Sequence, residues 1–130
     1  MELGFAFLCD AAQDSGGKLH ALGIGVDVLR AASMPAVHAR LSLVVRLTYG
    51  RADEGEHDFS IAVLDADGKE VVAPVGGQMT LRLGGDDMSG SANLVVDLQN
   101  TRFTTYGPHE VSVSLDGRPI VTLPLAVRRL

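Results

Sequence analysis

Four histidines and one cysteine are the side chains of this 130-residue sequence best suited to metal binding or catalysis. The neutral imidazoles of His20, His38, His57 and His109 could in principle form a metal site. Two ligands of such a site normally lie close in sequence, at i and i+2 on a strand, but these histidines are at least 18 residues apart. The spacing therefore predicts structural roles, with His20 hydrogen-bonded at the core edge and His109 bonded to nearby backbone.

Carboxylates on glycine-rich turns are the second set of candidate ligands, because calcium takes several oxygen ligands from one loop. The segment Asp65-x-Asp67-Gly68 resembles the start of such a loop, but Val63 and Pro74 would then stand at its first and last positions. We therefore predict a tight hairpin turn there. A calcium site could also form at one end of a sandwich. Its candidate ligands are Asp10, Asp86 and Asp87, with Asp14 or Asp53 beside them. Adjacent aspartates in a Gly/Ser loop are usually turn formers, so no metal or cofactor is predicted.

The single cysteine is the third candidate, as a nucleophile beside a histidine and an aspartate. Cys9 alternates in phase with Phe5 and Phe7, so it is expected to be buried, un-ionised and inert. No serine stands in a Gly-x-Ser-x-Gly elbow, and Gly23-x-Gly25 lacks the third glycine of a phosphate-binding turn. No catalytic residue is predicted, and a protein without enzymatic activity is favoured.

Composition and charge limit the function classes. The formal net charge is −5 and the basic residues are scattered, whereas a nucleic-acid binder needs a basic stripe. One cysteine forms no internal disulfide, and the N-terminal apolar run stops at Asp10, which predicts a cytoplasmic protein without a signal peptide. No apolar stretch is long enough to span a bilayer. We expect a single domain over residues 1–130.

The elements that would position these side chains show a period of two, which is typical of strands with one buried face. A first strand carries Leu3, Phe5, Phe7 and Cys9 on one face. A second, bent strand places Leu22, Ile24, Val26 and Val28 together. Further strands are expected over residues 41–49, 59–63, 71–72, 79–83, 92–98, 111–115 and 121–127. The loop 84–91 is expected to be the most mobile, and residues 27–33 to contain at most a helical turn.

The fold class follows from about eight to nine short strands with no helical stripe. Asp67-Gly68 and Asp116-Gly117 predict two hairpins, the first leading into Val71-Val72. We expect an all-β protein, a two-sheet antiparallel β-sandwich with immunoglobulin-like general architecture. Aromatic residues make up only 5% of the sequence, so aliphatic side chains should build the core.

Several segments together resemble an uncharacterised family of small bacterial all-β proteins, a domain of unknown function. They are Ala6-Phe7-Leu8-Cys9-Asp10, residues 17–23, Pro35-Ala36-Val37-His38, Gly55-Glu56-His57, Asp65-Ala66-Asp67-Gly68, Asp116-Gly117 and Leu123-Pro124-Leu125. The resemblance covers nearly the whole chain and implies fold, origin and size. It implies no catalytic residues.

The leading functional hypothesis is a non-catalytic binding or scaffold module whose partner meets loops or a sheet edge. Leu29, Val44 and Tyr49 are expected at an exposed edge, which makes self-association into a homo-oligomer plausible. One alternative is an enzyme or small-ligand carrier with a cleft near Asp10, His20 and His38. Another is a sandwich that binds lipid or a partner when calcium is present.

Overall fold

The computed structural model describes residues 1–130 and is all-β, as the alternation predicts. It contains ten strands and a single turn of 3-10 helix, η1. Their bounds are β1 Glu2–Cys9, β2 Ala11–Ser15, β3 Lys18–Leu22, β4 Val28–Ala31, β5 Ala36–Gly50, η1 Arg51–Asp53, β6 Gly55–Leu64, β7 Val75–Leu81, β8 Ser89–Phe103, β9 Gly107–Leu115 and β10 Arg118–Arg129. No helix is long and apolar enough to cross a bilayer.

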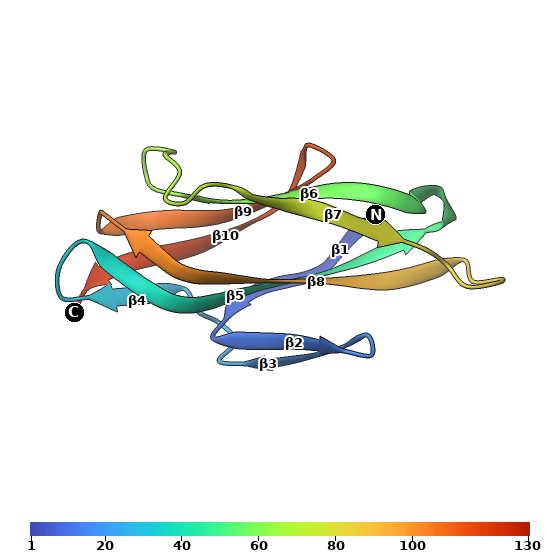
Figure 1. Cartoon of the computed structure of the whole chain (residues 1–130), viewed down its shortest axis with the longest axis horizontal. Coiled ribbons are helices and arrows are strands. Elements are labelled where there is room, and N and C mark those ends of the chain that lie inside the picture. Colours follow the sequence, from blue (N-terminus) through green and yellow to red (C-terminus); the bar gives the residue numbers. More distant parts are fainter.

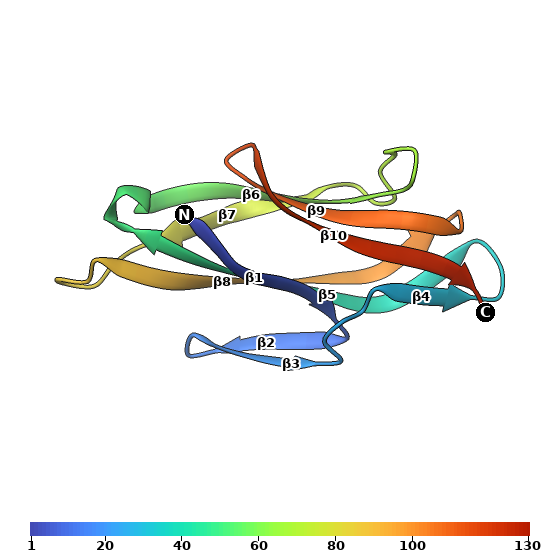
Figure 2. The ribbon, with the colours of Figure 1, turned by 180° about the vertical axis from the view of Figure 1, so that it is seen from behind.

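The strands form three hydrogen-bonded sheets that lie one above another (Figures 1 and 2). The middle sheet has the order β1-β5-β8, and a five-stranded sheet of order β4-β10-β9-β6-β7 lies on one side of it. The hairpin β2-β3 lies on the other side. All pairs are antiparallel except β4 with β10, which corrects the expectation of purely antiparallel sheets. The structure contains three sheets, so it does not confirm the expected two-sheet, immunoglobulin-like arrangement, which stays a prediction.

The main core lies between the middle sheet and the five-stranded sheet, and alternation on β5 shows why. Leu41, Leu43, Val45 and Leu47 are at most 1% exposed and all point to this side. They pack with aliphatic residues of the facing strands, above all Ile61, Val63, Val111, Val113, Leu115, Leu125 and Val127. Aliphatic residues therefore build most of the core, and Phe103 is its one aromatic residue.

The other face of the middle sheet is also buried, which the sequence did not suggest. Ser42 and Val44 of β5 and Cys9 of β1 have no exposed surface, yet none belongs to the main core cluster. The hairpin β2-β3 is the layer on this side (Figure 2). The expectation that Val44 is exposed at an edge is therefore wrong, because β5 is a central strand covered on both faces.

Polar contacts fix the hairpin's tip to the middle sheet. Arg46 donates to the Asn93 side-chain oxygen at 2.8 Å and to the Gly17 carbonyl at 3.4 Å. Asn93 in turn donates to the Asp14 carboxylate and to the Gly17 carbonyl. Gly16 and Gly17 have positive φ, so the chain reverses there without strain. The hairpin is thus tied to both β5 and β8.

The face of β1 that packs on the main core is the opposite of the predicted one. Ala6 and Leu8 point to the main core, whereas Phe5 and Phe7 pair with Arg46 and Val44 on the outer face. Phe5 is 42% exposed and stacks on Phe7, with ring centroids 5.8 Å apart. A register shift between residues 3 and 5 changes the phase, and period-two reasoning alone cannot see such a bulge.

The predicted bent strand over residues 18–29 is two strands in different sheets. Gly23 and Gly25 have φ of 67° and 100°, which breaks the extended chain between β3 and β4. Leu22 and Ile24 are 72% and 62% exposed, so the expectation that they are buried is wrong. The helical turn considered for residues 27–33 is absent, because Val28–Ala31 forms the parallel strand β4.

The two predicted Asp-Gly turns are both present. The Asp65 carboxylate accepts from the backbone N–H of Asp67 and of Lys69, as in a capped turn. Residues 71–72 form no strand, however, and β6 pairs instead with β7, which begins at Val75. Asp116 and Gly117 both have positive φ, and they connect β9 to β10 as a type I′ turn does.

Candidate functional site

Strand β8 forms a free edge of the middle sheet and is the longest unpaired edge in the protein. Its 15 residues pair with β5 alone. None of the eleven backbone hydrogen bonds outside the regular ladders involves a residue of β8. No side chain bonds to its backbone either, so its outward peptide groups have no partner in the protein.

The direction of each peptide group on β8 follows from one contact at the far edge. The Leu8 carbonyl of β1 accepts from Gly25 and Val26, so it points away from β5. Leu43 lies opposite Leu8 in the antiparallel ladder, so its own N–H and C=O groups also point away from β1 and toward β8. There they bond to Val96, whose peptide groups therefore point toward β5. The N–H and C=O groups of Ser91, Asn93, Val95 and Asp97 consequently point outward.

The side chains along β8 give the edge two different faces. On the core side, Ala92 and Val96 are half-buried beside the buried Leu94, so this face is apolar. On the hairpin side, the Asp97 carboxylate accepts from Ser42 at 2.5 Å and from Arg40 at 3.2 Å. Asn100, at φ 53°, interrupts the regular ladder, so the straight part of the edge ends near Gln99.

The other sheet edges are shorter or already blocked. On β1, the Leu8 carbonyl already accepts hydrogen bonds from the N–H groups of Gly25 and Val26. On β10, the Ala126 N–H donates to the Asp27 carbonyl on the β4 side. Position 124 faces the same side because it lies two residues earlier, and Pro124 has no N–H to offer there. Strand β7 is free but has only seven residues. Natural sheets block edges in such ways, and β8 carries neither a proline nor a lysine.

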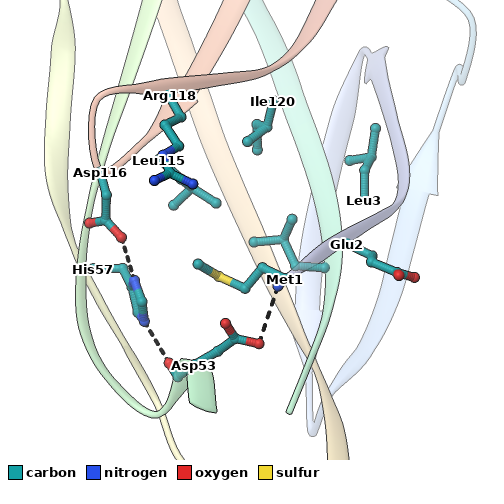
Figure 3. Close-up of a pocket in the computed structure, with 10 residues that line it drawn as sticks. Met1, Glu2, Leu3, Asp53, His57, Leu115, Asp116, Arg118 and Ile120 are labelled. Carbon is teal, nitrogen blue, oxygen red and sulfur yellow. Dashed lines mark hydrogen bonds and ion pairs between the residues drawn. The ribbon is translucent and has the colours of Figure 1, made fainter. Parts of the chain in front are cut away.

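A cavity of about 400 Å³ lies between β1 and the β9-β10 turn (Figure 3). Its apolar walls include Leu3, Leu47, Leu115 and Ile120. Met1 and five polar or charged residues line the remainder, namely Glu2, Asp53, His57, Asp116 and Arg118.

His57 connects three segments at the cavity wall. Its Nδ1 lies 2.6 Å from the Asp116 carboxylate, and its Nε2 lies 2.6 Å from the Asp53 carbonyl oxygen. Asp116 also accepts from the Asp58 backbone N–H, and Asp53 accepts from Gly50 and the Met1 amino group. Both imidazole nitrogens face acceptors, so the doubly protonated ring satisfies the site best. His57 therefore has no free nitrogen with which to act as a general base.

The pKa directions agree with this geometry. Hydrogen bonding to the Asp116 carboxylate, and then to the Asp53 carbonyl, raises the pKa of His57 above 6.5. The same bond from His57, and then that from the Asp58 N–H, lowers the pKa of Asp116 below 3.8. The Gly50 N–H, followed by the amino terminus, lowers the pKa of Asp53. The cluster is an ion-pair clasp at mildly acidic pH.

The carboxylates considered for calcium do not converge. Asp10 follows the end of β1, near Ser42 in the middle of β5. Asp86 and Asp87 lie in the loop before Ser89, which pairs with Gly50 at the end of β5. Eight residues of extended strand separate the two places, which corresponds to roughly 26 Å.

The cleft considered near Asp10, His20 and His38 is only partly assembled. A hollow of about 610 Å³ lies against the hairpin and is lined by Ala11, Ala12, Gln13, His20, Ala21, Leu22 and Arg40. Neither Asp10 nor His38 is among these residues. His20 itself is exposed and makes no hydrogen bond through its side chain, so the expected core-edge role is wrong.

The structure confirms two structural expectations and adds one site that the sequence did not show. Cys9 is fully buried, and burial raises the pKa of its thiol. His109 is 4% exposed, and its Nδ1 donates to the Gly107 carbonyl at 3.0 Å. The His57 clasp was not predicted. The one signal for it is that His57 shares the inward phase of Phe59 and Ile61 while lying at the start of a strand.

Comparisons with known proteins add a family match without an activity. A family model described as "Family of unknown function (DUF6941)" matches residues 4–128. No curated protein matches the chain.

Proposed function

The chain belongs to the DUF6941 family, and we propose that it is a non-catalytic binding module that takes an extended polypeptide segment onto the free edge of β8. The observation that carries this proposal is the row of outward peptide groups from Ser91 to Asp97, which have no partner in the protein. Adding a strand to such an edge is a common form of peptide recognition.

The two faces of β8 define the segment that would fit. Alternate side chains of an added strand point to opposite faces of the sheet. Those on the core side would cover Ala92 and Val96, whose half-buried surfaces favour apolar partners. Those on the hairpin side would meet Asn93, Val95 and Asp97, and the two polar residues of this face favour polar partners. The proposed occupant is therefore an extended segment with apolar residues at alternate positions.

The scaffold in this proposal keeps the expectations made from the sequence. The two larger sheets would act as an immunoglobulin-like sandwich that holds β8 rigid, and the hairpin would act as its outer support. We propose a cytoplasmic protein that uses this edge with a protein partner, or with a second copy of itself in a homo-oligomer. Sedimentation of the protein alone distinguishes the two, because pairing between copies raises the mass with concentration.

Proline substitution on β8 is expected to weaken segment binding. Residues 91 and 99 both carry N–H groups that point outward, so Ser91→Pro/Gln99→Pro removes two donors without breaking the ladder to β5. The probe is a display library of twelve-residue segments with alternating apolar positions. We expect selected segments to lose at least about tenfold in affinity for the double proline variant, since each lost hydrogen bond is worth about 1 kcal/mol.

The matched control is Ser91→Ala/Gln99→Ala, which changes the same side chains and keeps both N–H groups. This variant should bind the selected segments as the unsubstituted protein does. Equal binding to the proline and alanine variants, with both folded by circular dichroism, would show that the segments bind elsewhere. Failure of the library to yield any segment would also count against the proposal.

A further inference from the structure

Arg118 is the one cation of the cavity in Figure 3 that has no partner. It makes no hydrogen bond and no ion pair, although its side chain extends into the cavity beside Leu115 (Figure 3). The Met1 amino group is paired with Asp53, and both nitrogens of His57 are engaged. A guanidinium offers five donors, so this side of the cavity has unused capacity to bind an anion.

The acidic groups around the cavity form no hydrogen bond or ion pair with that guanidinium, although its charge acts on the nearby Asp116 carboxylate. Asp116 already accepts from His57 and from the Asp58 backbone, one bond to each carboxylate oxygen. Asp53 accepts from Gly50 and Met1. The carboxylate of Glu2 points away from the cavity in Figure 3. The two carboxylates of the clasp are therefore paired with the His57 ring and the Met1 amino group, and the N–H donors of Arg118 are left for a ligand.

Half of the ten lining residues are apolar. Leu47 and Leu115 are buried and belong to the main core, while Leu3 is 41% exposed. Ile120 completes this wall from β10. A volume of about 400 Å³ is near the small end of ligand pockets, which run from roughly 300 to 1,000 Å³. A chamber with an aliphatic wall and one unpaired cation, beside charged groups that are already bonded to each other, is suited to a small amphipathic molecule.

We propose that this cavity binds a carboxylate carried on a short aliphatic group, with Arg118 pairing the carboxylate and Leu3, Leu47, Leu115 and Ile120 covering the chain. Such a group occurs in a free medium-chain fatty acid and at the C-terminus of a peptide that ends in leucine. The guanidinium fork matches both oxygens of either carboxylate. This site lies apart from the β8 edge, so it does not depend on segment binding there.

The test uses octanoate as the probe, titrated into the protein while backbone amide signals are recorded by NMR. Octanoate should shift the amides of Leu3, Leu115 and Ile120. Arg118→Gln should weaken its affinity by about tenfold or more, because a charge-assisted pair is lost. Octanol, which keeps the chain and lacks the charge, should bind as weakly as octanoate binds the variant. An acetylated Gly-Leu peptide with a free C-terminus, compared with octanoate, identifies the better source of the carboxylate.

Two further variants keep the outcome decisive. Leu3→Trp adds bulk to the cavity wall and should abolish octanoate binding while leaving Arg118 in place. Arg128→Gln removes an exposed arginine at the other end of β10 and should leave the affinity unchanged. Equal affinity in Arg118→Gln, shifts confined to other residues, or no binding at millimolar octanoate would each overturn the proposal.

Discussion

Replacement of Val44 by aspartate is expected to destabilise the protein by at least about 4 kcal/mol, because it places a carboxyl group where no solvent reaches. Val44 is 0% exposed and lies outside the main core, on the face that the hairpin β2-β3 covers. Loss of the valine side chain alone contributes about 2 kcal/mol, and desolvation of the carboxyl group adds the rest. The measurement is the free energy of unfolding in urea.

The matched control is the same substitution on the same strand, Val37→Asp. Val37 is 61% exposed, so its replacement should change the free energy of unfolding by less than about 0.5 kcal/mol. Val44→Ala should fall between the two. If Val44→Asp were as mild as Val37→Asp, the hairpin would not be packed on the middle sheet in solution.

Replacement of His57 by alanine is expected to lower the free energy of unfolding by about 1 kcal/mol at pH 5. The substitution removes two hydrogen bonds that join the start of β6 to η1 and to the β9-β10 turn. The estimate stays modest because the Asp116 side chain is 43% exposed and water screens the pair.

The pH dependence of this effect has a definite sign. The folded pKa of His57 is raised above 6.5, so its contribution is complete below that value and is lost as pH rises through the folded pKa. The folded pKa of Asp116 is lowered below 3.8, so its contribution is present above 3.8 and is lost as pH falls through the folded pKa. The difference between the unsubstituted protein and His57→Ala should therefore be largest between about pH 4 and 6.5.

Asp116→Asn separates the ion pair from the turn. Asparagine tolerates the positive φ of position 116 and can still accept from the Asp58 N–H. This variant should remain folded, and its free energy of unfolding should lose most of the pH dependence that the His57–Asp116 pair contributes. A pH-independent difference for His57→Ala would mean that the ring is neutral in the folded protein.

Local pattern was enough to predict the strands that line the main core. Alternation places Leu41, Leu43, Val45 and Leu47 on one face, and the structure confirms this because the ladder of β5 with β8 is unbroken from Arg40 to Gly50. The Asp116-Gly117 turn was equally clear, because two positive φ values in succession need those residue types. Both signals depend only on neighbours in sequence.

The errors arise where the structure depends on distant segments. Phe5 and Phe7 alternate as a buried face would, but the bulge near Gly4 and the position of the hairpin decide which face is covered. Leu22 and Ile24 look like core residues, yet two glycines with positive φ turn the chain away from the sheet. A period of two identifies a strand and leaves its layer undetermined.

The sites were largely hidden from the sequence for the same reason. His57 and Asp116 are 59 positions apart and meet only because β6 pairs with β9. Asp10, Asp86 and Asp87 were grouped by residue type, and strand β5 holds them far apart. The free edge of β8 is a property of sheet order, which one sequence does not reveal.

Hydrogen exchange along β8, with and without a selected segment, tests most directly whether this edge receives a strand. In the free protein the amides of Leu94, Val96 and Leu98 should be protected by β5, while those of Asn93, Val95 and Asp97 should exchange rapidly. Addition of a selected segment should protect these three outward amides as well. Protection of the outward amides before any segment is added, or no change when a segment binds, would contradict the account.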